Sequence, residues 1–366
     1  MNKKNVCLTI HSLASSGGEE RMCTVLANAL IHRDYNVIVV TLNQCEKEKT
    51  TFKLEKSIKR YTCVKNNIER KLFSYSFLKK IPLIRYKHIL DKHKVDVIID
   101  VDIHQSLVTT KVTKGTAIKV ISWDHFNYER FAIRWSHDIM LDCFNSGEVD
   151  KLVVLTETDK KNFIEKEHLP KHFVECIYNP SPLQSDGFIS HKEKKVLSVG
   201  RLTEQKGFDL LLKAWNLVEK EIGDWQLEIV GSGVDEGKLK EMIKELHLSN
   251  VTISPFTDDI KSKYANASIY CLPSRTEGFG LVVVEAATMS VPSVAFACGG
   301  PEEIICDGEN GFLVERENHR MMAEKMIVLM RNKKLREQMS NNCYEWAKKF
   351  QIENIIENWT RLIEAL

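Results

Sequence analysis

Short runs of apolar and β-branched residues alternate with amphipathic stretches along the first half of the chain. The runs are five to eight residues long, as expected of strands that are buried on both faces. They cover Asn5–Ile10, Tyr35–Leu42, Val95–Asp100, Ala117–Ser122 and Lys151–Leu155. Between the first two, Glu19–His32 repeats its apolar residues at helical spacing. This alternation predicts a parallel sheet with helices on both faces.

The pattern breaks at residues 178–195 and then starts again. The break holds the turn-rich and polar stretches YNPSP, QSDG and HKEKK, which are typical of a linker. After it, strand-like runs at 196–200, 227–231, 251–256, 267–274 and 291–296 alternate with helical stretches at 207–220, at 235–246 and from about 280. The simplest interpretation is two doubly wound α/β domains in series. Because ligands bind at the carboxyl ends of such strands, we expect a site in an interdomain cleft.

The composition fits two soluble domains: 43% of the 366 residues are hydrophobic and 28% are charged. No apolar run approaches the roughly 18–20 residues that cross a bilayer, and the first residues lack the pattern of a signal peptide. The ten cysteines form no C-x-x-C pair and no Cys/His cluster at zinc spacing. We therefore expect a cytoplasmic protein without a disulfide framework or a structural metal.

The charge is unevenly distributed, although the net charge is only +2. Residues 47–94 hold fifteen Lys and Arg against four Asp and Glu, a density that attracts an anionic partner. Because no nucleic-acid-binding signature is present, a phosphorylated lipid surface is favoured over nucleic acid. Within this stretch, residues 68–93 interleave aromatic and basic side chains, which suits an interfacial helix on an anionic membrane. The alternative is an amphipathic helix packed on its own domain.

The densest chemical signal is the segment PSRTEGFGLVVVE, residues 273–285. A loop carrying Glu277 follows a strand, and a helix containing Glu285 starts near Gly280. Glycines allow a ligand close to the backbone, and a helix N-terminus suits a phosphate or an oxyanion. Two carboxylates at this spacing can accept hydrogen bonds from two parts of one polyol. The alternative is a charge favourable to the helix dipole together with one solvated glutamate.

Two further loops that follow strands are candidate phosphate-binding segments, and a third segment has the spacing of a metal-binding motif. Arg201 and Lys206, in VGRLTEQKGF, can bind a diphosphate without metal, although surface cations before a helix are common. The segment Ser15–Glu20 occupies a phosphate-loop position, but it matches neither the P-loop nor the dinucleotide-binding motif. Asp100 and Asp102 have the spacing of a D-x-D metal motif. Because they end a buried strand, we predict no catalytic metal.

Together, in this order, these segments resemble the retaining glycosyltransferases of the two-Rossmann (GT-B) type, family 4, also called group 1. The likeness covers nearly the whole chain. It is strongest in VGRLTEQKGFDLLLKAW, IVGSGVDEGKLKEMIKELHLSNVTISPF, LPSRTEGFGLVVVEAATMSVPSVAF and GGPEEIICDGENGFLV. The resemblance implies an acceptor-binding domain at 1–180, a nucleotide-sugar-binding domain at 181–345, and a C-terminal helix at 346–366 that can cross back to the first domain.

The resemblance also assigns roles to the matching positions. Glu285 would hold the ribose of a nucleotide sugar, and Glu277 and Gly278, with the amides of Phe279, Gly280 and Leu281, would hold the transferred sugar. Arg201 and Lys206 would neutralise the diphosphate in place of a metal. Gly17 and Gly18 would lie over the phosphates, and Phe256 would line the nucleobase. His125 would bond the transferred sugar or orient the acceptor; the alternative is a hydrogen-bonded loop histidine. The catalytic set is then His125, Arg201, Lys206 and Glu277.

The predicted function is metal-independent, retaining transfer of a hexose or N-acetylhexosamine. The expected donor is a UDP-sugar, with GDP-mannose second. The expected acceptor is a lipid-linked oligosaccharide at the inner face of the cell membrane, in bacterial O-antigen or capsule biosynthesis. One alternative is a soluble sugar synthase or phosphorylase of the same fold. Another is a non-catalytic nucleotide-sugar-binding partner, which has less need of Arg201 and Lys206.

Overall fold

The computed structural model describes residues 4–67, 69, 80–185, 187–190 and 193–366 of the chain. Contacts between Cα atoms divide the chain into two units. Unit 1 is Met1–Pro182 together with Ile352–Leu366, and unit 2 is Leu183–Gln351. Each unit contains one sheet with its own core.

The sheet of unit 1 has seven parallel strands in the order β3-β2-β1-β4-β5-β6-β7. They are β1 (Asn5–Ile10), β2 (Asn36–Thr41), β3 (Lys59–Thr62), β4 (Val97–Asp100), β5 (Lys119–Trp123), β6 (Lys151–Val154) and β7 (Val174–Cys176). β1 pairs with β2 on one side and with β4 on the other, so the strand order reverses beside it. Loops that leave a parallel sheet beside such a reversal diverge and form a binding site at its carboxyl edge.

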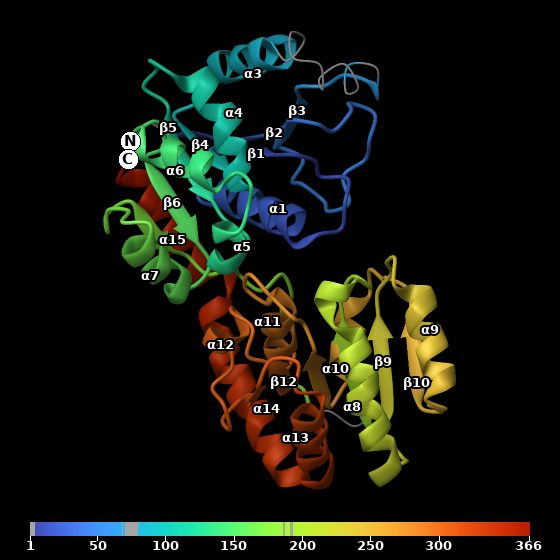
Figure 1. Cartoon of the computed structure of the whole chain (residues 1–366). Helices are drawn as coiled ribbons and strands as arrows, with labels where there is room; N and C mark the ends of the chain where they lie inside the picture. The colour runs from blue at the N-terminus through green and yellow to red at the C-terminus, as the bar shows by residue number, and fades with distance from the viewer. Residues whose placement is uncertain (1–3, 68, 70–79, 186, 191–192) are drawn as a thin grey trace. The chain divides into compact units, whose positions relative to one another are not determined.

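Seven described helices belong to unit 1 (Figure 1). They are α1 (Gly18–Ile31), α3 (Lys80–Lys92), α4 (Ile103–Thr113), α5 (Tyr128–Ala132), α6 (His137–Asn145), α7 (Glu157–Lys166) and the C-terminal α15 (Ile352–Glu364). α15 buries one apolar face, including Trp359, whose ring centroid lies 4.8 Å from that of Trp123. The Tyr35 hydroxyl also donates to Glu364 Oε1 over 2.6 Å. These contacts make the end of the chain part of unit 1.

The sheet of unit 2 has six parallel strands in the order β10-β9-β8-β11-β12-β13. They are β8 (Lys195–Val199), β9 (Gln226–Val230), β10 (Val251–Ser254), β11 (Ile269–Leu272), β12 (Ser293–Phe296) and β13 (Gly311–Val314). Its helices are α8 (Phe208–Glu221), α9 (Glu236–Glu245), α10 (Ile260–Asn266), α11 (Leu281–Thr288), α12 (Pro301–Ile304), α13 (His319–Arg331) and α14 (Lys333–Ala347). The short 3-10 helices η1 (Glu204–Lys206) and η2 (Lys348–Phe350) complete the unit.

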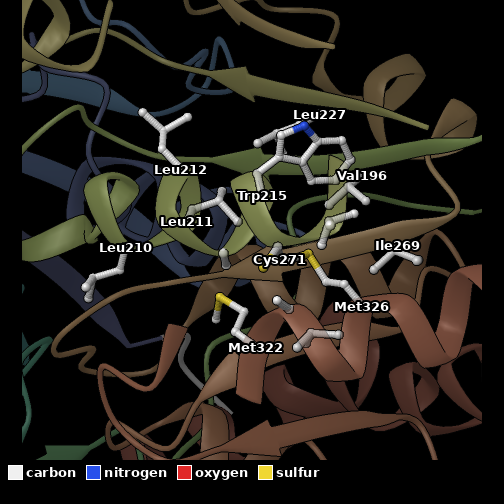
Figure 2. Close-up of a cluster of buried hydrophobic side chains, with 14 of the residues drawn as sticks. Val196, Leu210, Leu211, Leu212, Trp215, Leu227, Ile269, Cys271, Met322 and Met326 are labelled. Carbon is white, nitrogen blue, oxygen red and sulfur yellow. The ribbon is translucent and has the colours of Figure 1, made fainter. Parts of the chain in front are cut away.

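The core of unit 2 lies where α8 and α13 pack on the sheet. The fully buried indole of Trp215 comes from α8, and Met322 and Met326 come from α13. Figure 2 shows these side chains with Cys271 of β11 in one cluster. Removing a buried aromatic side chain of this kind from a core costs roughly 3–5 kcal/mol. The cluster therefore gives rigid support to the strands from which the site loops emerge.

The predicted fold class is confirmed, since both sheets are wholly parallel and covered by helices. The strand Asn5–Ile10 has the predicted bounds, and the helix predicted at 207–220 is α8. The sequence pattern did not predict β3, β7 or β13, each of which lies at a sheet edge. β3 and β7 have the polar or very short sequences KRYT and VEC, which lack the apolar signal of a central strand.

Of the interfacial helix predicted at 68–93, residues 68 and 70–79 lie outside the described residues. Among those that are described, α3 covers Lys80–Lys92. No helix in the described ranges combines the length and the apolar character needed to cross a membrane.

Candidate active site

The loop after β8 turns sharply into α8 at Gly207. This glycine has a left-handed φ of 65°, and a Cβ added there would lie 2.0 Å from the carbonyl oxygen of Pro273. No larger residue fits without moving the backbone. The loops after β8 and β11 are neighbours because these two strands pair in the sheet. Gly207 thus allows the two loops to meet backbone to backbone.

Side-chain hydrogen bonds fix the two loops to each other. The Arg275 guanidinium donates two bonds of 2.9 Å to the carboxylate of Asp209 and one of 2.6 Å to the Glu204 carbonyl. Gln205 Nε2 donates to the Thr276 carbonyl over 3.0 Å. Bidentate arginine–carboxylate pairs are strong and directional. The residues between these anchors are consequently held in one geometry.

Lys206 and Glu277 form an ion pair between the two loops. Lys206 Nζ donates to Glu277 Oε1 over 2.6 Å, and Ser274 Oγ donates to the same oxygen over 2.7 Å. Their side chains are 18% and 9% exposed, so solvent screens the pair weakly. Sequence analysis assigned Lys206 to a diphosphate and Glu277 to a sugar. The structure adds that the two side chains contact each other.

The N-terminus of α11 lies just after Glu277 and Gly278, with Phe279 and Gly280 in between. Gly280 has a left-handed φ of 86° and precedes the first helical residue, Leu281. Phe279 is buried, with its ring centroid 5.9 Å from that of Phe350. The N-cap residue Gly280 has no side chain that could cap this end of the helix, so the first backbone N–H groups are suited to an anion or a polar oxygen.

Glu285 lies one turn inside α11 and is only 2% exposed. The Tyr264 hydroxyl donates to its Oε2 over 2.9 Å. A buried carboxylate with such a donor is held in position and can accept further hydrogen bonds.

Arg201 and Phe256 are the exposed members of the predicted set in unit 2. Arg201 follows β8, and among the described residues its guanidinium has no hydrogen bond or ion pair. Phe256 follows β10 and is 50% exposed. Both side chains thus stand at the carboxyl edge of the sheet, where a ligand can reach them.

The remaining predicted residues belong to unit 1. Gly17 and Gly18 stand at the start of α1, and Gly17 has an ordinary φ of −78°. A Cβ added at Gly17 would lie 2.5 Å from Glu20 Oε2, which is the end of a flexible side chain. His125 follows β5, with its ring centroid 4.3 Å from that of Trp123.

His125 and Asp124 carry buried polar atoms that have no hydrogen-bond partner among the described residues, Nε2 and Oδ2 respectively. Burial lowers the pKa of His125 to about 3, although Asp102 opposes this shift. Burial raises the pKa of Asp124 to about 8, although the Phe126 amide, which donates to its Oδ1 over 3.0 Å, opposes it. Near neutral pH, His125 is uncharged and Asp124 is mostly protonated.

A hydrogen-bonded chain that sequence analysis missed lies at the same edge of unit 1. His104 Nδ1 donates to Asp102 Oδ1 over 2.8 Å, and its Nε2 accepts from Ser136 Oγ over 2.8 Å. Asp102 also accepts from the His104 amide at the start of α4. The i to i+2 spacing of Asp102 and His104 was the only signal in the sequence. Ser136 is 32 residues away from His104, so only the fold reveals it.

The two carboxylates of the D-x-D spacing bind groups of their own unit. Asp100 is fully buried and accepts hydrogen bonds from Ser106 and Thr109. Within the described part of the chain, no three His, Cys, Asp or Glu residues gather as a metal site would require.

The raised pKa of Asp124 predicts a pH-dependent stability. The folded state holds the Asp124 proton more tightly than the unfolded chain, in which the carboxyl pKa is near 3.8. The contribution of this proton to the free energy of unfolding is therefore full below about pH 4 and is lost as pH rises toward 8. Relative to wild type, Asp124→Asn should therefore gain stability between pH 5 and 8 and change little above. Urea unfolding at several pH values measures this, with the exposed Asp142→Asn as control. If the free energies of unfolding of wild type and Asp124→Asn changed with pH in parallel, the Asp124 carboxyl would have the same pKa in the folded and unfolded states.

Two family models together match most of the chain. "Glycosyltransferase Family 4" matches residues 16–184, and "Glycosyl transferases group 1" matches residues 183–346. A glycosyltransferase of Haemophilus influenzae is 33% identical over 98% of this chain and 100% of its own length. The amylovoran biosynthesis glycosyltransferase of Erwinia amylovora is 29% identical over 97% of this chain and 98% of its own. A Campylobacter jejuni N-acetylgalactosaminyltransferase named for a diphospho-undecaprenol acceptor is 26% identical over 95% of both chains.

Solved structures share the fold at low sequence identity. The complex of an S. aureus TarM variant with UDP and alpha-GlcNAc-glycerol has a TM-score of 0.82 and 18% identity, covering 98% of this chain and 99% of that one. Anabaena HepE in complex with UDP and glucose has a TM-score of 0.80 and 17% identity, covering 99% and 100%.

Proposed function

This chain belongs to the family 4, or group 1, glycosyltransferases, and on that premise we propose that it moves a sugar from a UDP-sugar to a lipid-linked oligosaccharide with retention of configuration. It is an enzyme of the GT-B type that transfers hexosyl groups, with relatives in bacterial polysaccharide biosynthesis. The observation that carries the proposal is the Lys206–Glu277 ion pair, which joins two loops beside the N-terminus of α11, where the N-cap residue is Gly280.

The donor site of this proposal lies on unit 2. Glu285 accepts hydrogen bonds from the ribose, and Phe256 lines the nucleobase. Glu277, Gly278 and the amides of Phe279, Gly280 and Leu281 hold the transferred hexose or N-acetylhexosamine. UDP is favoured because the TarM and HepE structures are named as complexes with it. Gly17 and Gly18 of unit 1 have the proposed role of contacting the donor phosphates.

Departure of the diphosphate is the main chemical demand. The bond from the anomeric carbon to the diphosphate oxygen breaks, the acceptor hydroxyl oxygen bonds to the same face of the sugar, and the hydroxyl proton passes to the departing diphosphate. The transition state of the sugar resembles an oxocarbenium ion. Negative charge then develops on the leaving oxygen, and preorganised cations are the strongest means of stabilising it. Arg201 has no hydrogen bond or ion pair among the described residues, and Lys206 is held by Glu277; in this proposal the two cations supply the positive charge that the diphosphate meets.

His125 completes the proposed catalytic set from unit 1. Its lowered pKa keeps the ring neutral, so Nε2, which has no partner among the described residues, can exchange hydrogen bonds with a sugar hydroxyl. A neutral ring places no positive charge beside an oxocarbenium-like sugar.

The proposed acceptor site faces an anionic membrane through residues 68–93 at the inner face of the cell membrane. In the described part of this segment, α3 carries Ile84, which is 68% exposed, among basic residues. The Campylobacter relative, whose name contains an undecaprenol-linked acceptor, supports a lipid-linked substrate for this chain as well.

Calorimetric titration with UDP, GDP and NAD tests the donor site. We expect UDP to bind, to bind more tightly than GDP, and to bind equally in EDTA and in Mg²⁺, because Arg201 and Lys206 supply the positive charge. The anomeric proton coupling of a transfer product, measured by NMR, tests retention. Binding that needs Mg²⁺, binding of NAD alone, or a product of inverted configuration would each contradict the proposal.

A further inference from the structure

A cluster of basic side chains lies in unit 1, and none of them belongs to the residues proposed to bind the donor. The loop between β2 and β3 borders a wide, open hollow of about 590 Å³, lined by side chains within residues 46–60. We call it the basic hollow. Its lining contains five basic residues, Lys47, Lys49, Lys53, Lys56 and Arg60, and three acidic ones, Glu46, Glu48 and Glu55.

The backbone around the basic hollow is fixed by side-chain hydrogen bonds. Gln44 is fully buried and donates to the carbonyls of Glu48 and Lys49 over 3.1 and 3.2 Å. Arg60 donates to the carbonyls of Glu46 and Glu48 over 2.8 and 3.0 Å. Because folding already orders this loop, a ligand would bind to it with little further loss of conformational entropy.

The charges around the hollow are not balanced within the protein. Lys47, Lys49, Lys53 and Lys56 are exposed, and none has an ion pair or hydrogen bond from its side chain among the described residues.

Two of the three carboxylates already face other groups. Glu48 Oε2 accepts from the Cys45 amide over 2.8 Å, and Glu55 Oε1 lies 3.9 Å from His32 Nε2. With five basic and three acidic side chains in its lining, the hollow keeps a net positive charge, which a multivalent anion relieves.

The hollow suits a polar anion better than a lipid tail. The large exposed hydrophobic side chains of the described chain are at other positions, such as Ile84, Ile133 and Trp135. Peripheral membrane contacts usually combine basic groups with such apolar anchors. Here the basic groups are present without the anchors.

The hollow is also joined to the loop that follows β1. The Thr51 amide donates to the Leu13 carbonyl over 2.9 Å, and Thr51 Oγ donates to the Ala14 carbonyl over 2.8 Å. The loop beginning after β1 leads to Gly17 and α1. The hollow therefore belongs to the same group of loops at the carboxyl edge of the sheet in unit 1.

We propose that the basic hollow binds the phosphate groups of the acceptor, a diphosphate or phosphodiester, as a second anion site separate from Arg201 and Lys206. The proposal rests on the proposed function, in which the acceptor carries phosphate. It assigns Lys47, Lys49, Lys53 and Lys56 to acceptor recognition.

The test is calorimetric titration of the full chain with inorganic pyrophosphate at two salt concentrations. An Arg201→Gln, Lys206→Gln background removes the donor cations, and we expect pyrophosphate still to bind it. Adding Lys47→Gln, Lys49→Gln, Lys53→Gln and Lys56→Gln should weaken that binding roughly tenfold or more and flatten its salt dependence. The control replaces four exposed lysines elsewhere, Lys171, Lys213, Lys220 and Lys334, by Gln and should change the affinity little.

Equal losses in the two quadruple variants would overturn the proposal, because net charge alone would explain them. Loss of all pyrophosphate binding in the donor-defective background would overturn it as well. A third arm uses phosphatidylglycerol vesicles. If the hollow variant lost vesicle binding but kept pyrophosphate binding, the site would be a membrane contact and the proposal wrong. None of these measurements requires sugar transfer, so failure of this proposal can be distinguished from failure of the proposed function.

Discussion

Lys206→Met is expected to lower kcat/KM for sugar transfer by roughly 10²–10³-fold, the range found when one preorganised charge-stabilising group is removed. The methionine keeps most of the side-chain volume but removes the cation 2.6 Å from Glu277 Oε1. Because negative charge on the diphosphate grows toward the transition state, the loss should appear mainly in kcat. Steady-state kinetics with a UDP-sugar donor measures it.

The same substitution should also destabilise the protein. Glu277 would be left buried without its cation, which costs up to about 3 kcal/mol when such a pair is well shielded. Glu277→Gln in the same chain should restore much of that stability, because the amide oxygen still accepts from Ser274 and no unpaired charge remains. Activity should stay low in the double variant. Recovery of both stability and transfer would show that Lys206 only balances Glu277.

Arg201→Met tests the effect of losing a cation on catalysis without leaving a buried carboxylate unpaired. Arg201 is exposed and has no side-chain partner among the described residues, so unfolding should shift by no more than about 0.5 kcal/mol. Transfer should nevertheless fall clearly, because the guanidinium is proposed to meet the diphosphate. If Arg201→Met transferred sugar at the wild-type rate, the leaving-group role would have to be reassigned.

Sequence patterns predicted the centre of each sheet well and the edges poorly. Central strands are buried on both faces, so β2, β4 and β11, with the sequences NVIVVT, VIID and IYCL, show largely apolar runs that are easily detected. An edge strand can be short and polar because one side meets solvent or a single neighbour. β3, with the sequence KRYT, has no apolar period to detect and is defined only by its pairing with β2.

In the candidate site, too, features set by neighbouring residues could be predicted from the sequence, whereas contacts between distant residues could not. Gly207 and Gly280 follow strands and precede helices, so their turn positions could be inferred from the neighbouring sequence. The contact between Lys206 and Glu277 joins residues that are 71 positions apart. It depends on the pairing of β8 with β11, which no local pattern contains. For the same reason, the position of Ser136 beside His104 required the fold.

Glu285→Gln should weaken UDP binding roughly 10- to 100-fold, the expected cost of losing hydrogen bonds to a charged acceptor. The carboxylate is 2% exposed and is held by the Tyr264 hydroxyl, so its position is set before the nucleotide arrives. The amide keeps the shape and still accepts from Tyr264, but it presents a neutral oxygen and an NH₂ donor to the two ribose hydroxyls. Calorimetric titration with UDP gives the affinity, and thermal unfolding shows whether the fold is intact.

Tyr264→Phe distinguishes nucleotide binding by Glu285 from a purely structural role. This variant removes the donor to Glu285 Oε2 and leaves the carboxylate in place, so it should lower stability more than it lowers UDP affinity. Glu285→Gln should show the opposite balance, with affinity reduced and the melting temperature nearly unchanged. If both variants lost stability in parallel and UDP affinity followed stability, Glu285 would serve only to anchor Tyr264 in the core. A loss of affinity confined to Glu285→Gln would instead require direct contact between the carboxylate and the nucleotide.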